Sequence, residues 1–233
     1  MKKLILSGFV LLASSIGIFA GDAAAFVDLG ISQDGKTYAF GEYGKTDKNY
    51  QGYAEIYTVD IAKNDFIDGE VFRTNPSAQT VSKGGKAVFD DLYAKAAWKL
   101  KKYDFKKADV DNLLYVRDDR KEGESEIVFK DFEGSTSEQS VFYHIQLVKN
   151  VEGKDSTLRS SFFITMEKKD EAGNVLSRHT VGSPDIKRKN VLGYRIDRIF
   201  SDKTGRNLVF VVEKTLQDVN GTSIRYMVET ISL

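Results

Sequence analysis

Apolar and polar residues alternate along most of the chain with a period of two, which is typical of half-buried β-strands. The first such segments cover residues 26–32, 37–43, 52–61 and 66–72. Within them, Tyr57 and Val59 fall on one strand face, whereas Ala54 and Ile56 fall on the other. This alternation predicts strands that each present two distinct faces.

One segment has the period of an α-helix instead. Between residues 86 and 103, apolar side chains recur at helical spacing, namely at Phe89, Leu92, Tyr93, Ala96, Leu100 and Tyr103. Ser82 is a suitable N-cap, and lysines gather near the C-terminal end, where they oppose the helix dipole. We therefore expect one amphipathic helix, as an insertion at about residues 84–104.

The strand pattern returns after the helix. The expected strands are residues 113–116, 126–132, 140–149, 158–168, 175–181, 194–200, 207–214 and 223–233. Residues 183–190 are polar and contain Pro184, so they are expected to form a connection. The pattern predicts a mainly β fold with one helix, built as an antiparallel curved sheet or sandwich, or as a distorted propeller-like assembly.

Three turns carry glycine where a hairpin needs a positive φ. They contain Asp34 and Gly35, Gly205, and Asn220 with Gly221. The segments 31–40 and 200–210 are similar to each other, and both resemble the repeats of TolB-type β-propeller proteins. That resemblance covers about 35 residues at each end and implies that the two ends have related hairpins.

The N-terminus has the three parts of a secretory signal peptide. Lys2 and Lys3 precede the apolar run 4–19, and Ala20 ends it with a small residue. We expect cleavage after Ala20, which leaves residues 21–233 as a single β-rich domain in the periplasm or outside the cell. The chain has no cysteine, so a lipoprotein anchor is not expected. A stable membrane span after cleavage is not expected either.

Composition narrows the possible partners. The precursor has 34 basic and 34 acidic residues, and loss of Lys2 and Lys3 leaves a small negative net charge. A nucleic-acid partner is therefore not expected. The remaining candidates are a protein or a glycan of the cell envelope.

No catalytic or metal-binding motif is present. The two histidines, His144 and His179, lie in separate strand segments, and the spacing of zinc ligands is absent. No cofactor and no metal are expected. We interpret the chain as a non-catalytic binding or interaction module; the alternative is an envelope hydrolase that acts on glycans or peptides through carboxylates.

Two groups of residues are candidates for binding. Tyrosines offer a flat apolar ring with a polar tip that suits sugars and proteins. The candidates among the first expected strands and their loops are Tyr43, Tyr50, Tyr53 and Tyr57. Lysines around the helix end suit an anionic partner, and the candidates are Lys95, Lys99 and Lys102, within a run that continues to Lys106 and Lys107.

The layout as a whole resembles an uncharacterised family of predicted secreted bacterial proteins, a domain of unknown function. The signal peptide and residues 21–30 and 53–60 carry this resemblance. It implies export and no particular activity.

Overall fold

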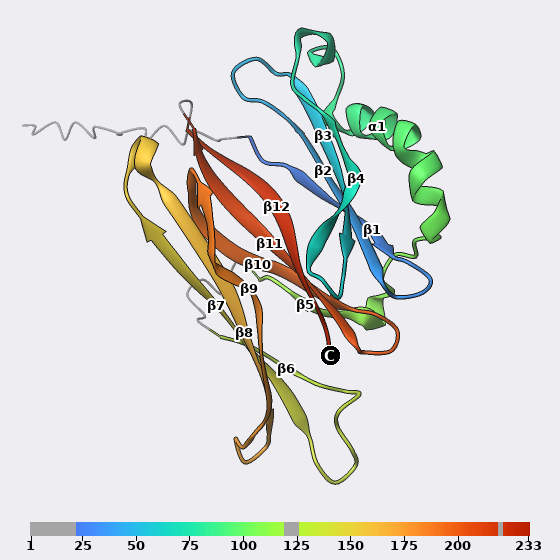
Figure 1. Ribbon diagram of the computed structural model, residues 1–233, viewed down its shortest axis with the longest axis vertical. Coiled ribbons are helices and arrows are strands. Elements are labelled where there is room, and N and C mark those ends of the chain that lie inside the picture. The colour runs from blue at the N-terminus through green and yellow to red at the C-terminus, as the bar shows by residue number, and fades with distance from the viewer. Residues whose placement is uncertain (1–21, 119–125, 219–220) are drawn as a thin grey trace, which may run out of the picture.

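The computed structural model describes residues 22–118, 126–218 and 221–233. In these residues, twelve strands form three four-stranded antiparallel sheets, and one α-helix lies against the first of them (Figure 1). The expected leader, residues 1–20, lies outside the described residues. The prediction of a mainly β fold with one helix is confirmed.

The first sheet has the order β1-β2-β3-β4. Its strands are β1 Ala25–Ile31, β2 Thr37–Lys45, β3 Gly52–Asp60 and β4 Asp65–Thr74. Helix α1, Gly85–Leu100, packs on one face of this sheet, between the short 3-10 turns Ala78–Thr80 and Lys101–Tyr103. The predicted division of β3 is confirmed, because Ala54 and Ile56 contact the helix while Tyr57 and Val59 pack on the opposite side.

The other two sheets come from the rest of the chain. The central sheet has the order β12-β11-β10-β5 and consists of β5 Leu113–Val116, β10 Val191–Ser201, β11 Asn207–Asp218 and β12 Gly221–Ser232. The outer sheet has the order β6-β7-β8-β9 and consists of β6 Ile127–Lys130, β7 Val141–Glu152, β8 Arg159–Asp170 and β9 Val175–Lys189. Short 3-10 turns at Val110–Asn112 and Asp155–Thr157 precede β5 and β8.

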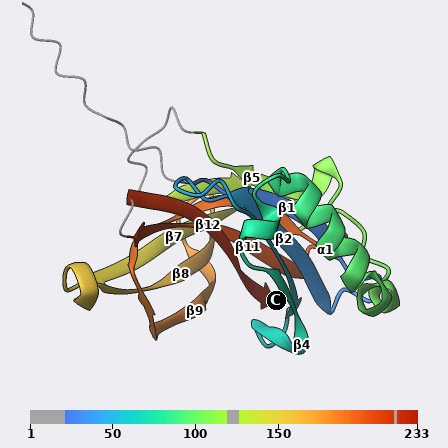
Figure 2. The same ribbon diagram turned by 90° about the horizontal axis from the view of Figure 1, so that it is seen from above.

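The layers follow the order helix, first sheet, central sheet, outer sheet (Figure 2). Strand β11 explains this order. Its residues Leu208, Phe210 and Val212 pack against the outer sheet, whereas Val209 and Val211 pack against the first sheet. A strand that is buried on both faces must be apolar without alternation, which is why residues 208–212 are a continuous apolar run.

Two expectations about element boundaries are wrong. Residues 183–190 are not a connection, because β9 continues through Pro184 to Lys189. Proline cannot donate a ladder hydrogen bond, but β9 is an edge strand, and its register with β8 shifts near Ser183. Proline is tolerated at such a place.

The N-cap of α1 is Gly84 rather than Ser82, and no side chain caps the helix. The helix starts where Gly85 meets β2. A Cβ at Gly85 would lie 2.8 Å from the carbonyl oxygen of Gly44, so this close approach to the sheet decides where the helix begins.

Candidate binding pocket between two related turns

The two similar segments fold into similar turns. In the β1–β2 turn, Ser32 Oγ donates to Asp34 Oδ1 over 2.6 Å, and the amide of Lys36 donates to the same oxygen. These hydrogen bonds, with that from Ser32 as the largest cause, lower the pKa of Asp34. Gly35 has a φ of 71°, which side chains strongly disfavour.

The β10–β11 turn repeats the arrangement with Asp202 as its centre. The carboxylate of Asp202 accepts hydrogen bonds from the amides of Thr204 and Arg206, at 3.2 and 3.0 Å. Gly205 has a φ of 66°. Both aspartates therefore hold backbone turns in place: Asp34 does so through Oδ1, and both carboxylate oxygens of Asp202 accept hydrogen bonds.

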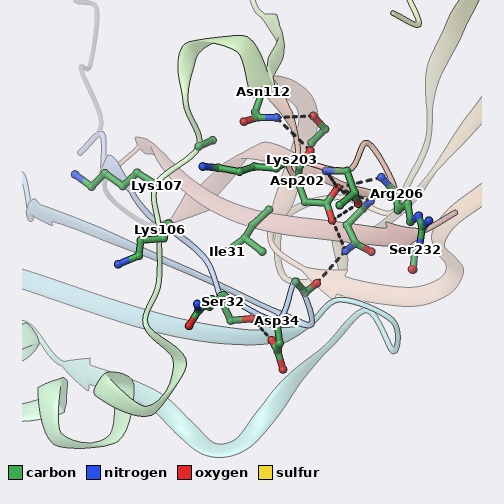
Figure 3. A pocket seen from close by; sticks show the side chains of 16 residues that line it. Ile31, Ser32, Asp34, Lys106, Lys107, Asn112, Asp202, Lys203, Arg206 and Ser232 are labelled. Carbon is green, nitrogen blue, oxygen red and sulfur yellow. Dashed lines mark hydrogen bonds between the residues drawn. The ribbon is translucent and has the colours of Figure 1, made fainter. Parts of the chain in front are cut away.

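The two turns are joined directly. Asn207 Nδ2 donates to the carbonyl oxygen of Gly35 and to Asp202 Oδ2, both over 2.9 Å (Figure 3). At the other end of the first sheet, Ala23 forms a parallel β-bridge with Ile224. The first and last hairpins of the described chain, β1–β2 and β11–β12, are thus neighbours, and their apolar faces pack together.

A third segment, residues 106–108, completes the surroundings of the turns. Ile31 and Lys106 exchange two backbone hydrogen bonds of 2.9 Å. The approach depends on Gly30, where φ is 110° and a Cβ would lie 2.1 Å from the carbonyl oxygen of Lys106. Farther along the chain, Asn112 Nδ2 donates to the backbone oxygen of Asp202 over 3.1 Å and ties the residues that follow this segment to the second turn.

These three segments enclose a cavity of about 450 Å³, which we call the two-turn pocket. Its apolar lining includes Ile31 and Ala108, and its polar lining includes Ser32, Gln33, Asn112, Thr204 and Ser232. Such a mixture of apolar surface and neutral hydrogen-bonding groups suits a hydroxyl-rich small molecule.

The charged groups of the two-turn pocket are mainly basic. The lining contains Lys106, Lys107, Lys203 and Arg206 beside the two turn aspartates. Lys203 extends from its turn toward the segment that carries Lys106 and Lys107 (Figure 3), where its Nζ lies 3.5 Å from Asp109.

Lys106 is paired with Asp104 at 2.9 Å. Within the part of the chain that the structure describes, Lys107 and Arg206 have no ion-pair partner within 4.0 Å. The pocket thus offers free positive charge next to neutral polar groups, which favours an anionic ligand.

The tyrosines expected to bind a ligand lie in different surroundings. Tyr53 and Tyr57 are buried, and Tyr43 packs on Phe89 with ring centroids 5.6 Å apart. Tyr50 is 66% exposed. The four tyrosines do not form one surface.

Two of the lysines expected to bind, Lys99 and Lys102, are engaged by neighbouring residues of β4. Lys99 Nζ donates to the carbonyl oxygen of Gly69 over 2.7 Å, and Lys102 Nζ lies 2.6 Å from Glu70 Oε1. Lys95 is exposed on α1. Only the end of the lysine run, Lys106 and Lys107, reaches the two-turn pocket.

Sequence reasoning did not select Lys203, Arg206, Asn112 or Asn207 as site residues. A signal was available for three of them, because Lys203, Arg206 and Asn207 belong to the second copy of the repeated turn. Of the remaining turn residues, Gly221 has a φ of 135°, and Asn220 lies outside the described residues.

Among the described residues, three carboxyl groups have a raised pKa, and burial is the main cause for each: Asp28, Glu42 and Glu229. None of the three lines the two-turn pocket. Glu42 is 2% exposed; burial raises its pKa to about 7, although Lys214 and the hydrogen bond from the Tyr226 amide favour the ionised form. That amide donates to Glu42 Oε2 over 2.7 Å.

Among the described residues, no group of three or more His, Cys, Asp or Glu side chains is arranged to hold a metal ion. His144 lies on β7, with Nδ1 3.2 Å from Glu126 Oε1, and His179 lies on β9. The intervening strand β8 separates the two histidines.

Comparison with protein families identifies the class to which this layered β fold belongs. The chain belongs to the family described as “Predicted secreted protein (DUF2259)”, whose profile matches residues 39–232. No curated protein and no solved structure matches the chain. None of the helices in the described ranges has the length and apolar character needed to cross a membrane.

Proposed function

We propose that this protein is an exported, non-catalytic binding module that holds an acidic glycan of the cell envelope in the two-turn pocket. The observation that carries the proposal is the set of four basic side chains around the pocket, while both aspartates are engaged in turns. A cavity of about 450 Å³ is of the size that small-molecule sites usually have.

The neutral lining supports a sugar rather than a simple inorganic anion. Ser32, Gln33, Asn112 and Thr204 supply hydroxyl and amide groups beside the basic residues. Sugar hydroxyls both donate and accept, so they match such groups, while a uronic acid carboxylate matches the lysines and the arginine.

The experiment is titration calorimetry with trigalacturonic acid and with neutral maltotriose. We expect the acidic trisaccharide to bind and the neutral one not to bind. The double variant Lys107→Gln/Arg206→Gln should weaken binding by about tenfold or more, because it removes two charge-assisted contacts.

The matched control is Lys95→Gln/Lys149→Gln, which removes two exposed lysines elsewhere. Equal weakening by both double variants would show nonspecific charge attraction and contradict the proposed site. Equal binding of the two trisaccharides, or no binding of the acidic one at millimolar concentration, would contradict the acidic glycan.

The finer features of export are part of the same proposal. We propose that a leader of residues 1–20 is cleaved after Ala20 and that the mature protein acts in the periplasm or outside the cell. Mass spectrometry of the exported protein tests the cleavage site. The similarity of the two turns also supports the prediction that they are TolB-type repeats.

A carboxylate-dependent hydrolase is the alternative function, and the pKa of about 7 for Glu42 supports it, because a general acid works best near the operating pH. Products released from envelope glycans or peptides, and absent with Glu42→Gln, would favour this alternative. Intact substrates after prolonged incubation would count against it.

A further inference from the structure

A second cavity lies where the three sheets meet, and we call it the three-sheet pocket. Its volume is about 590 Å³. The first sheet contributes Phe40, Tyr57, Val59, Phe66 and Arg73 with the turn 63–65; the outer sheet contributes Gly182, Ser183, Ile186 and Arg188; the central sheet contributes Lys214 and residues 226–229. None of these residues lines the two-turn pocket.

One wall of the three-sheet pocket is a stack of aromatic rings. Phe40 and Tyr57 stack with centroids 4.8 Å apart, and Tyr57 and Phe66 stack at 5.1 Å. The outermost ring, Phe66, is 43% exposed, and Ile186 on the outer sheet is 54% exposed. Both residues line the pocket, which therefore presents apolar surface suited to a flat ring.

The lining contains four basic side chains, and three of them have counter-ions. Lys63 pairs with Asp60 at 3.0 Å, Arg73 with Glu55 at 3.1 Å, and Arg188 with Glu229 at 3.5 Å. Lys214 differs: among the described residues, no carboxylate lies within 4.0 Å of its ammonium group, and no hydrogen-bond acceptor is in reach.

The position of Lys214 makes this lack of a partner costly. Burial is the main cause that lowers the pKa of Lys214, and the repulsion from Arg188 and Arg225 acts in the same direction; Glu42 and Glu55 act against it. Lys214 is half-buried, and an ammonium group that is partly withdrawn from water without a counter-ion is stabilised by an anion bound beside it.

The free edge of β12 supplies a further donor. Along this edge, the amide of Tyr226 donates to Glu42 and the amide of Thr230 donates to Asn64. Alternate amides of an antiparallel strand point to the same edge. The amide of Val228, which lies between these two and lines the pocket, therefore points to the edge as well.

We propose that the three-sheet pocket binds a small aromatic carboxylate, with Lys214 as its counter-ion and Phe66, at the exposed end of the aromatic stack, against its ring. The single unpaired cation matches one negative charge. The stacked wall and the exposed Phe66 and Ile186 match an apolar ring. This ligand differs in chemistry from the acidic glycan of the two-turn pocket, so neither proposal depends on the other.

The experiment compares biphenyl-4-carboxylate with biphenyl-4-carboxamide, which has the same shape without the charge, by ligand-observed NMR and titration calorimetry. We expect wild-type protein to bind the acid about tenfold or more tightly than the amide. Lys214→Met keeps the apolar stem and removes the charge, so it should abolish this preference.

Lys63→Met is the matched control, because it makes the same change at a paired, exposed lysine of the same pocket. It should leave the preference for the acid within about threefold of the wild type. Phe66→Ala changes only the mouth, and it should weaken the acid and the amide equally.

Three outcomes would overturn the proposal: equal affinity of wild-type protein for acid and amide, equal losses with Lys214→Met and Lys63→Met, or no binding of the acid at 1 mM. Circular dichroism spectra establish that each variant is folded. If Lys214→Met does not fold, the acid–amide comparison and Phe66→Ala still decide the result.

Discussion

Glu42 makes the stability of this protein depend on pH, and the direction of that dependence follows from the pKa of its buried carboxyl group. Its carboxyl group lies between the first and central sheets, 2% exposed, and burial raises its pKa from 4.5 to about 7. Lys214 and Arg225 favour the charged form, Glu55 opposes it, and the amide of Tyr226 donates to it. The folded state therefore holds this proton more tightly than the unfolded chain does.

The sign follows from proton linkage. Below pH 4.5, Glu42 is protonated in both states and costs nothing. Between pH 4.5 and 7, the folded state binds more protons than the unfolded state, so stability falls as the pH rises. Above pH 7 the cost is complete and amounts to about 3 kcal/mol, since a tenfold change in proton affinity corresponds to about 1.4 kcal/mol.

Glu42→Gln is the test of this reasoning. The amide oxygen of glutamine can still accept from the Tyr226 amide, but the side chain never ionises. We expect the variant to match the wild type at pH 4 and to be more stable by up to about 3 kcal/mol at pH 8.5, which corresponds to roughly 6–12 °C in melting temperature.

The assay is urea denaturation of both proteins at pH 4, 6 and 8.5, followed by far-UV circular dichroism. Trp98, the single tryptophan, is 73% exposed and would report poorly on the core. Glu138→Gln, on an exposed turn, is the control and should give the same small difference at every pH. A stability difference for Glu42→Gln that does not change with pH would refute the reasoning, as would a variant less stable than wild type at pH 8.5.

Three further predictions concern packing and the two-turn pocket. Phe210→Ala should lower the free energy of unfolding by about 3–5 kcal/mol in urea denaturation, because Phe210 is fully buried in β11; a loss below 1 kcal/mol would contradict the layer order. Gly30→Ala should destabilise the protein by more than about 2 kcal/mol, because its Cβ would collide with the Lys106 carbonyl; thermal melting checks this, and unchanged melting would contradict it. Asn207→Ala removes the hydrogen bond to Gly35 that joins the turns and the one to Asp202 within the second turn, and it should cost about 1–3 kcal/mol; faster amide exchange confined to the two turns would confirm the local origin, and unchanged exchange there would argue against it.

Most of the fold could be predicted from the sequence because burial on one or two faces leaves a clear pattern. Alternation located β3 and its two faces, and helical spacing located α1. Such patterns are set by neighbours in the chain and need no knowledge of distant contacts.

The errors arose where tertiary contacts decide the outcome. A proline usually ends a strand, but Pro184 lies on an edge strand, where the hydrogen bond that it cannot donate would face no partner strand. Ser82 is a good cap by type, yet the contact of Gly85 with Gly44 sets the start of the helix.

The candidate pockets could be predicted only in part. The repeated turns with Asp34 and Gly35 were visible in the sequence, but their junction through Asn207 depends on how the sheets pack. Lys214 gave no signal at all, because a lysine in a strand looks the same whether its ammonium group is paired or not. Only the surroundings of its side chain distinguish it.

The central sheet is made mostly from the last strands of the sequence, and this order has a consequence for how the protein is synthesised and folds. Three of its four strands, β10, β11 and β12, lie in residues 191–232, so they leave the ribosome after both flanking sheets have been made. Until then, the apolar inner faces of the flanking sheets have nothing to cover them. The newly made polypeptide therefore cannot complete its layered core until residues 191–232 have been synthesised. An incompletely folded chain suits passage through a narrow export channel.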